Sequence, residues 1–393
     1  MITIVLHLNN QTEFSHYRWK KFDTYLKYTY NSSKTTMNIT AITSHKRSSQ
    51  YIWCVNHYGP NNQLKDFVKC CIIAMINNYT LIIPPLFPHY RQKHKGIQLF
   101  DHFYDLKQLR HALNFITLDQ FISKPKINSN RMMIDCYLQQ IELIAASAWY
   151  PNNTLILTQR YYKINIDFHR LINLSRNFHM SELFNKSKDC SSIFLHIDYT
   201  IFRQFFLFPN IYIKQIFEHL YRTPLIQRMT SQLIKQLPQL VIGKNHSQTN
   251  LSTLAVIHIR IGDHIVMNIS MYIKQILYLF NNGVHFTHLH IMCPYLNSAD
   301  IKQLTDNLPI VFTTSQHLLH HVNFVLDSYL FDVLEQEIAY QAPIFIASPR
   351  TTYSATVLMQ KVYQEQGTVY VLSTKKNNHP LLVTKQNVKY FEQ

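Results

Sequence analysis

The amino-acid sequence predicts an α/β protein built from two doubly wound units, and three observations lead to that class. Short apolar runs typical of strands alternate with amphipathic helices, first over residues 51–83 and again over residues 254–372. A polar segment at 238–252 lies between these stretches and is expected to be a linker. The 393 residues are enough for roughly two or three domains with a large buried core.

The first regular unit is a strand, a helix and a second strand. The strands are expected at 51–55 and 81–83, and apolar residues recur at helical spacing over 64–76. A strand that returns to its sheet after one helix pairs in parallel with its predecessor. The unit therefore predicts a parallel pair, with Asn61 or Asn62 at the N-cap of the helix.

The middle of the chain is less regular. Helices are expected at 132–149 and 211–239 from the apolar pattern. The resulting division assigns 1–44 to an N-terminal extension, 45–248 to an N-terminal lobe and 249–393 to a C-terminal lobe.

From residue 254 the pattern is regular, with five strands and four helices in alternation. The strands are expected at 255–261, 287–293, 310–313, 344–347 and 368–372. The helices are expected at 271–280, 299–308, 329–341 and 354–366, with a cap at Ser298 and Gly367 at the C′ position of the last helix. Such alternation predicts a mostly parallel sheet with helices on both faces.

The composition excludes several classes of site. The six glycines are too widely spaced for a Rossmann fingerprint or a Walker A loop, so any phosphate must be held in another way. The six cysteines contain no C-x-x-C pair, and their count does not reveal whether or how they pair. The apolar runs are too short to span a membrane, and residues 1–8 lack the features of a signal peptide.

The net charge of +16 is compatible with nucleic-acid binding, but lysine and arginine are scattered along the chain without a basic block. We expect no nucleic-acid partner and consider a basic cleft for a small anionic ligand instead. A nucleic-acid binder, which depends on charge alone, stays as an alternative.

Polar residues follow three of the predicted strands, in loops 57–63, 257–264 and 348–354. Ligands of open α/β sheets bind at the carboxyl ends of the strands, so these loops are the candidate site. His258 and Arg260 alternate along one strand and share a face, which is costly inside a sheet unless they meet a ligand. Arg260 is suited to bind phosphate through two parallel hydrogen bonds; the alternative is a structural pair with Asp263 across the turn.

The other two loops open helices. In the third loop, Thr351, Thr352 and Ser354 offer hydroxyls beside the N–H groups of the first helical turn, and Arg350 adds charge. This predicts an anion site without glycine, with an ordinary cap as the alternative. The amides at 61–63 are either caps or groups that orient a sugar or a phosphate.

These loops resemble the motifs of the GDP-fucose-dependent protein O-fucosyltransferases. The first motif and the strand after it correspond to residues 58–63 (YGPNNQ) and 76–85 (INNYTLIIPP). The second corresponds to 258–263 (HIRIGD) and the third to 345–354 (FIASPRTTYS). Cys54 also stands where the family often has a cysteine, and the resemblance covers about residues 50–375.

Several motif positions differ from the family pattern. Pro60 and Asn61 stand where relatives have Phe-Gly, and Ala347 stands where they have glycine. Pro343 replaces an acidic residue common before the last strand. The differences favour keeping a non-catalytic homologue as an alternative.

The resemblance implies a GT-B-like fold, in which two Rossmann-like doubly wound lobes enclose a ligand cleft. It implies transfer of fucose from GDP-fucose to a hydroxyl of a protein acceptor with inversion, without a metal, in the ER or Golgi lumen. The N-terminal lobe would face the acceptor and the C-terminal lobe the nucleotide sugar. An enzyme acting on a glycan, or a non-catalytic protein that binds a nucleotide or sugar, is the alternative.

The resemblance also assigns roles. Arg260 would stabilise the leaving diphosphate, and Asn62 would position the leaving group and the acceptor. Glu335 would match an acidic position that contacts the base. The donor-binding residues would be Asn61, His258, Gly262, Asp263, Glu335, Arg350, Thr351, Thr352 and Tyr353.

Overall fold

The structure is a computed structural model. The expected N-terminal extension, 1–44, lies outside the residues that it describes. The described residues are 50–55, 60–87, 97–123, 131–140, 145–175, 180–196, 210–242, 254–261, 267–293, 295–321, 328–349, 351–374 and 379–388.

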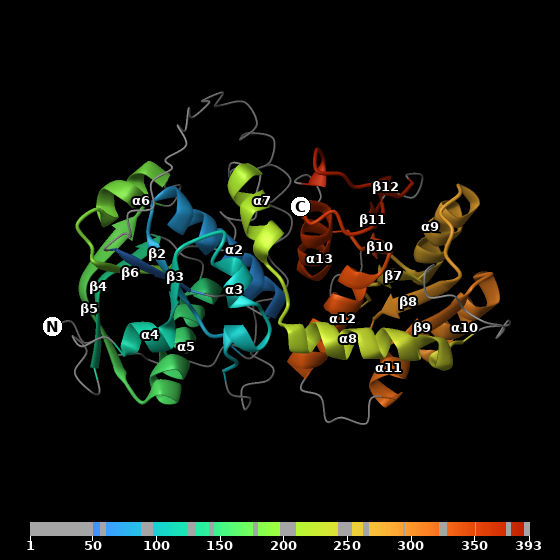
Figure 1. Cartoon of the computed structure of the whole chain (residues 1–393), viewed down its shortest axis with the longest axis horizontal. Helices are drawn as coiled ribbons and strands as arrows, with labels where there is room; N and C mark the ends of the chain where they lie inside the picture. Colours follow the sequence, from blue (N-terminus) through green and yellow to red (C-terminus); the bar gives the residue numbers. More distant parts are fainter. Residues whose placement is uncertain are drawn as a thin grey trace. The chain divides into compact units, whose positions relative to one another are not determined.

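The first half of the chain forms a parallel six-stranded sheet of order β3-β2-β1-β6-β4-β5 (Figure 1). Its strands are β1 (Tyr51–Cys54), β2 (Thr80–Ile83), β3 (Phe115–Thr117), β4 (Arg131–Gln140), β5 (Asn165–Leu174) and β6 (Ser192–His196). The parallel pairing of β1 with β2 confirms the strand–helix–strand unit expected from the sequence.

Helix α2 (Pro60–Ile76) connects β1 to β2 and begins earlier than the apolar pattern indicates. Proline suits the first helical position because its φ angle is already helical and its missing N–H has no partner to lose there. Asn61 and Asn62 therefore lie inside the first turn, and the prediction that one of them caps the helix was wrong.

The prediction of a helix at 132–149 was also wrong. Residues 131–140 form strand β4, and helix α5 (Ala145–Tyr162) begins only after it. Strand β4 pairs with β5 on one side and β6 on the other. Both faces of β4 are buried, since Met132 and Ile134 pack in one core while Cys136 and Leu138 pack in the other. Burial on both faces is typical of a central strand in a parallel sheet.

The stretch expected as one helix at 211–239 is two helices, α7 (Asn210–His219) and α8 (Pro224–Gln236), with η6 (Leu237–Leu240) after them. Thr223 caps α8, and Pro224 follows it at the first helical position, which starts a new helix. The remaining helices of this half are η3 (Phe100–His102), α3 (Leu106–Leu109), α4 (Leu118–Ile122) and α6 (Met180–Ser187).

The second half forms a six-stranded sheet of order β12-β11-β10-β7-β8-β9, parallel except for β12. Its strands are β7 (Leu254–His258), β8 (His288–Met292), β9 (Val311–Thr314), β10 (Ile344–Ala347), β11 (Thr368–Val371) and β12 (Leu381–Leu382). The five expected strands are confirmed, and the short antiparallel β12 was not predicted.

The helices of this half are α9 (Ile269–Asn281), α10 (Ser298–Asn307), α11 (Ser315–His321), α12 (Ser328–Gln341) and α13 (Thr352–Tyr363). The four expected helices are confirmed, but two of their expected ends were wrong. Asn297, not Ser298, caps α10, since its amide oxygen accepts the Asp300 N–H. Helix α13 is capped at Gln364, so Gly367 lies beyond its C′ position.

Both sheets are covered on both faces, as a doubly wound fold requires. In β1, Ile52 and Cys54 pack in the core with α2, whereas Trp53 points to the opposite core with α4. In β7, Val256 joins the core beneath α12 and α13, while Ala255 and Ile257 face α9 and α10. Alternate residues of one strand therefore serve different helix layers.

The segment that connects the two halves contacts elements of the second half before the first strand of the second sheet begins. Helix α8 packs against α12, and Ile242 forms a backbone bridge with Phe312 of β9. The lobe boundary expected at residue 248 stays a prediction.

Candidate functional site

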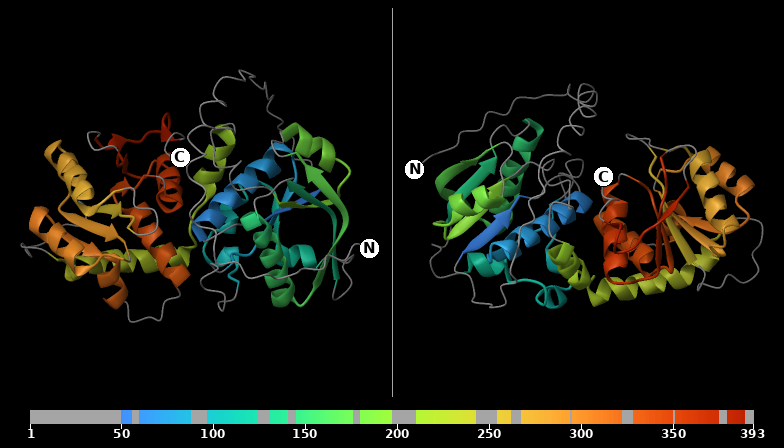
Figure 2. Two further views of the ribbon diagram at one scale, coloured as in Figure 1. Left: turned by 180° about the vertical axis from the view of Figure 1, so that it is seen from behind. Right: turned by 90° about the horizontal axis from the view of Figure 1, so that it is seen from above.

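The helices that follow the first and third candidate loops pack directly against each other. Helix α2 begins after β1, α13 begins after β10, and the two are in contact (Figure 2). Asn62 lies in the first turn of α2 and is half-buried, while Tyr353 lies in the first turn of α13. The fold thus brings together two helices whose first residues, Pro60 and Thr352, are 292 positions apart in the chain.

His258 ends strand β7 and contacts the start of α13. Its Nδ1 lies 2.7 Å from Ser354 Oγ and 3.3 Å from Thr351 Oγ1. Its ring lies against the ring of Tyr353, with centroids 4.7 Å apart. Burial, with the nearby positive charge of Arg260, lowers the pKa of His258 to about 3, so the imidazole is neutral at physiological pH. His258 therefore supplies a hydrogen bond and a ring surface at this place, without a charge.

The hydroxyls at the start of α13 already have partners inside the protein. Thr351 is the N-cap, and its Oγ1 accepts the Ser354 N–H at 3.1 Å. Ser354 is buried, and its Oγ accepts the Ser348 N–H at 3.1 Å while also meeting His258. These hydroxyls shape the loop and hold the helix start at the carboxyl end of the sheet, where its dipole favours an anion.

Arg260 lies two residues beyond the end of β7 and is half-buried. Its backbone N–H donates to Tyr272 Oη at 3.2 Å, and the same oxygen lies 2.7 Å from Ser348 Oγ. The sequence analysis missed Tyr272 because it reads as an apolar residue of α9. The only sequence signal was its hydroxyl, since a buried tyrosine usually finds a hydrogen-bond partner.

Glu335 is buried on α12 and lies beside the middle of β8. Its Oε1 is 3.4 Å from His290 Nε2, and His290 Nδ1 lies 2.9 Å from Thr313 Oγ1. Its charge also acts on Tyr353, because burial first and Glu335 second raise the pKa of that phenol. Glu335 therefore lies in a buried polar cluster next to the start of α13, and base contact stays a prediction.

In the first motif the two neighbouring amides differ. Gln63 is buried and bonds the backbone of Phe87 twice, since its Nε2 donates to the Phe87 carbonyl at 2.7 Å and its Oε1 accepts the Phe87 N–H at 2.8 Å. This fixes the Pro84–Pro85 segment after β2 to α2. Gln63 is therefore a structural clamp, and the role expected for Asn62 stays a prediction.

Five of the predicted site residues are only partly covered or not covered by the structure. Gly262, Asp263 and Arg350 lie outside the described residues. Asn61 and Thr352 are placed in the first turns of α2 and α13 by their backbone alone. The described site residues that lie in contact are His258, Thr351 and Tyr353, with Arg260 bonded to Tyr272 beside them.

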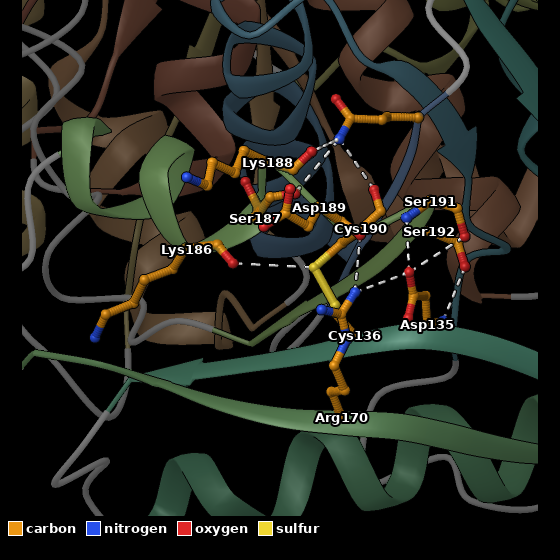
Figure 3. A network of polar contacts seen from close by, with 11 residues as sticks. Asp135, Cys136, Arg170, Lys186, Ser187, Lys188, Asp189, Cys190, Ser191 and Ser192 are labelled. Carbon is orange, nitrogen blue, oxygen red and sulfur yellow. Dashed lines mark hydrogen bonds and ion pairs between the residues drawn. A yellow bond between two sulfur atoms is a disulfide. The ribbon is translucent and has the colours of Figure 1, made fainter.

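Two disulfides hold the first sheet. Cys54–Cys70 joins the end of β1 to the middle of α2, and so it closes the chain on either side of the first candidate loop. Cys136–Cys190 joins β4 to the residues before β6. Figure 3 shows that second bridge within a polar network in which Asp135 accepts from Ser191 N–H at 2.8 Å and from Arg170 at 3.0 Å. This network lies where β6 begins, at the edge of the sheet opposite to the candidate loops.

Among the residues that the structure describes, no cluster of three or more His, Cys, Asp or Glu is arranged to hold a metal ion. Within the same residues, no helix is both long and apolar enough to cross a membrane.

The comparisons with known proteins identify relatives of this arrangement. The sequence model of the GDP-fucose protein O-fucosyltransferase family matches residues 51–275. A structure of POFUT1 in complex with GDP superposes with a TM-score of 0.58 at 10% identity, covering 83% of this chain and 99% of POFUT1. A structure of POFUT1 in complex with GDP-fucose superposes with a TM-score of 0.55 at 10% identity, covering 81% of this chain and 96% of POFUT1. At this identity the likeness shows the fold, and that fold is of the GT-B type.

A putative ankyrin repeat protein of Acanthamoeba polyphaga mimivirus is 20% identical over 271 residues, which is 60% of this chain and 56% of that protein. The chain therefore spans about half the length of this curated relative.

Proposed function

Because the chain belongs to the GDP-fucose protein O-fucosyltransferase family, we propose that it transfers fucose from GDP-fucose to a hydroxyl of a protein, with inversion at the anomeric carbon. The observation that carries the proposal is the bonded group of His258, Thr351 and Ser354 beside Arg260, at the carboxyl end of the second sheet. POFUT1, which shares the fold, has been solved with GDP and with GDP-fucose.

The chemistry follows from the charge that develops on the donor. The acceptor oxygen forms a bond to the anomeric carbon as the bond from that carbon to the diphosphate breaks, and the acceptor proton passes to water. The departing GDP gains negative charge in the transition state, which resembles an oxocarbenium ion on the sugar. Arg260 and the positive end of α13 would stabilise that charge, and a preorganised donor of this kind contributes roughly 3–4 kcal/mol.

The other donor contacts are assigned by position. The neutral His258 ring and the Tyr353 ring form one surface, which we assign to the nucleotide. We propose Asn62 for orienting the acceptor and leaving group, since its helix α2 packs against α13. The further donor-binding residues of the proposal are Asn61, Gly262, Asp263, Glu335, Arg350, Thr351 and Thr352.

The cellular location belongs to the proposal too. Disulfides persist in oxidising compartments, and the described residues contain two of them. This supports the ER or Golgi lumen, which the family resemblance also implies. The first half of the chain would face the acceptor and the second half the nucleotide sugar.

The proposal is tested by donor binding and turnover. GDP should raise the melting temperature, and fucose from GDP-fucose should appear on a member of a panel of folded protein acceptors. Arg260→Ala should lower kcat by about 10²–10³-fold with an unchanged melting temperature. Arg228→Ala, at an exposed arginine of α8, is the matched control and should leave turnover unchanged.

Each outcome has a separate meaning. A chain that does not bind GDP contradicts the donor assignment. Binding of GDP without turnover on any acceptor supports a non-catalytic homologue, and turnover on free glycans alone contradicts the protein acceptor. Unchanged turnover in Arg260→Ala would remove that residue from the mechanism.

A further inference from the structure

Tyr272 is a residue outside the three motifs that connects two of them. It lies on α9 with an exposed fraction of 1%. Its ring packs in the core between α9 and the second sheet. Its hydroxyl is the polar end of an otherwise apolar contact, and it lies where the second and third motifs meet.

The Tyr272 hydroxyl accepts a hydrogen bond from a backbone N–H that no longer pairs with a neighbouring strand. Ile259 N–H still donates to the Met292 carbonyl at 3.1 Å, as the continuation of the pairing between β7 and β8. The next residue, Arg260, leaves the ladder, and its N–H donates to Tyr272 Oη at 3.2 Å. A backbone N–H that leaves a sheet needs another acceptor, and this bond ties the backbone to α9 at the point where it departs from β7.

The same oxygen continues into the third motif. Tyr272 Oη lies 2.7 Å from Ser348 Oγ, and Ser348 N–H donates to Ser354 Oγ at 3.1 Å. Ser354 Oγ in turn meets His258 Nδ1 at 2.7 Å, which returns the path to the end of β7. A closed circuit of hydrogen bonds therefore joins the backbone of Arg260, the loop after β10 and the start of α13.

We propose that Tyr272 is a positioning residue for fucosyl transfer, whose hydroxyl holds the Arg260 backbone at a fixed place relative to Ser348 and the start of α13. The inference rests on the proposed function, because it concerns the two groups assigned to the leaving diphosphate. Tyr272 touches neither donor nor acceptor in this role. It acts on Arg260 by fixing the point from which the guanidinium extends.

The test removes one oxygen. Tyr272→Phe keeps the ring in the core and deletes the hydroxyl, while Tyr278→Phe, on the same helix at a half-buried ring stacked on His379, is the matched control. We expect Tyr272→Phe to lower kcat by about tenfold or more, because misplacement of a catalytic group by about 1 Å costs up to roughly 100-fold. The KM for GDP-fucose should change by less than about threefold, because the misplaced charge matters most in the transition state. The control should match the wild type in both constants.

A double-mutant cycle separates positioning from general structural support. In the Arg260→Ala background, Tyr272→Phe should cause no further loss of kcat, since the group that it positions is absent. An equal loss with and without Arg260 overturns the inference, and so does a kcat within about twofold of the wild type for Tyr272→Phe alone.

Hydrogen exchange gives a readout without any donor. The amides of 259–261 should exchange faster in Tyr272→Phe than in Tyr278→Phe, because the Arg260 N–H has lost its acceptor. Equal exchange in the two variants overturns the inference even when the enzyme is active. If the wild type binds no GDP while Tyr272→Phe still exchanges faster than Tyr278→Phe, the positioning contact is supported and the proposed function is refuted, so the two failures are distinguishable.

Discussion

Gln63 offers a sharp test of which motif residues serve the fold and which serve the chemistry. Its buried amide forms two hydrogen bonds to the backbone of Phe87, at 2.7 and 2.8 Å. The clamp joins the first turn of α2 to the segment that follows Pro84 and Pro85, and so it connects the two halves of the first motif. We predict that Gln63 contributes to stability through these two bonds.

The expected loss follows from the bonds themselves. Gln63→Ala deletes two hydrogen bonds that are each worth roughly 0.5–1.5 kcal/mol, and it leaves one N–H and one carbonyl of Phe87 without these partners. An unpaired buried group costs about 1–3 kcal/mol, and water entering the space would recover part of this cost. We therefore expect the free energy of unfolding to fall by about 2–5 kcal/mol.

The assay is urea denaturation followed by circular dichroism, with Gln108→Ala at an exposed position of α3 as the control. Asn62→Ala, at the residue proposed to orient the acceptor and the leaving group, should reduce fucose transfer strongly. A loss below about 0.5 kcal/mol for Gln63→Ala, at an unchanged dependence on urea, would refute the clamp.

Three further predictions concern stability. Lowering the pH from 6.5 toward 3 should destabilise the protein through His258 by up to about 1.4 kcal/mol per pH unit. The unfolded state gains the imidazole proton in that window, whereas the folded state, with a His258 pKa of about 3, does not. His258→Asn should flatten this dependence in urea titrations. Gly367→Ala should lower the free energy of unfolding by more than about 3 kcal/mol, because its Cβ would lie 2.3 Å from a backbone oxygen. Gly283→Ala, also at positive φ but in open space, should lower it by about 1–2 kcal/mol. Equal losses of stability in thermal unfolding would contradict this. Replacing the Cys136–Cys190 pair, which closes a loop of 54 residues, should lower the free energy of unfolding by about 4 kcal/mol. Replacing the Cys54–Cys70 pair, which closes 16 residues, should lower it by about 3 kcal/mol. The reverse order in urea denaturation would show that loop closure does not determine their contributions.

The second half of the fold was predictable because its signals agree with one another. Strands such as Ile344–Ala347 are short, apolar and separated by helices with clear periodicity, so local preference and burial indicate the same element. The first half was less predictable where this agreement fails. Strand β4 carries Asp135 and two glutamines beside its apolar residues, and the same letters are compatible with a helix when the neighbours that bury β4 are unknown.

The candidate site was predictable to the extent that it depends on topology. The rule that ligands bind at the carboxyl ends of parallel strands selected the loops of His258 and Thr351, and these residues lie in contact. Tyr272 was not predictable, because its partner Ser348 is 76 residues away and only the folded sheet brings them together. The disulfide partners were not predictable either, since six cysteines permit many pairings and only the folded chain shows which of them meet.

The positions at which this chain departs from the family pattern are accommodated by the local structure. Ala347 is fully buried in β10, and its side chain packs in the core with α12 and α13, so its methyl group fills space between layers. Pro60 opens α2 at the position that proline favours in a helix, where no hydrogen bond is lost.

The contacts that assemble the site, by contrast, use backbone groups and hydroxyls directly after these positions. Ser348, the residue after Ala347, provides both its N–H and its hydroxyl to the circuit that reaches Arg260. Replacement of the motif glycine at 347 therefore leaves the groups that shape the site in place. It follows that the lost glycine alone does not argue for an inactive protein. Under the proposed function, the variables to test are the charge at Arg260 and the hydroxyl that holds its backbone.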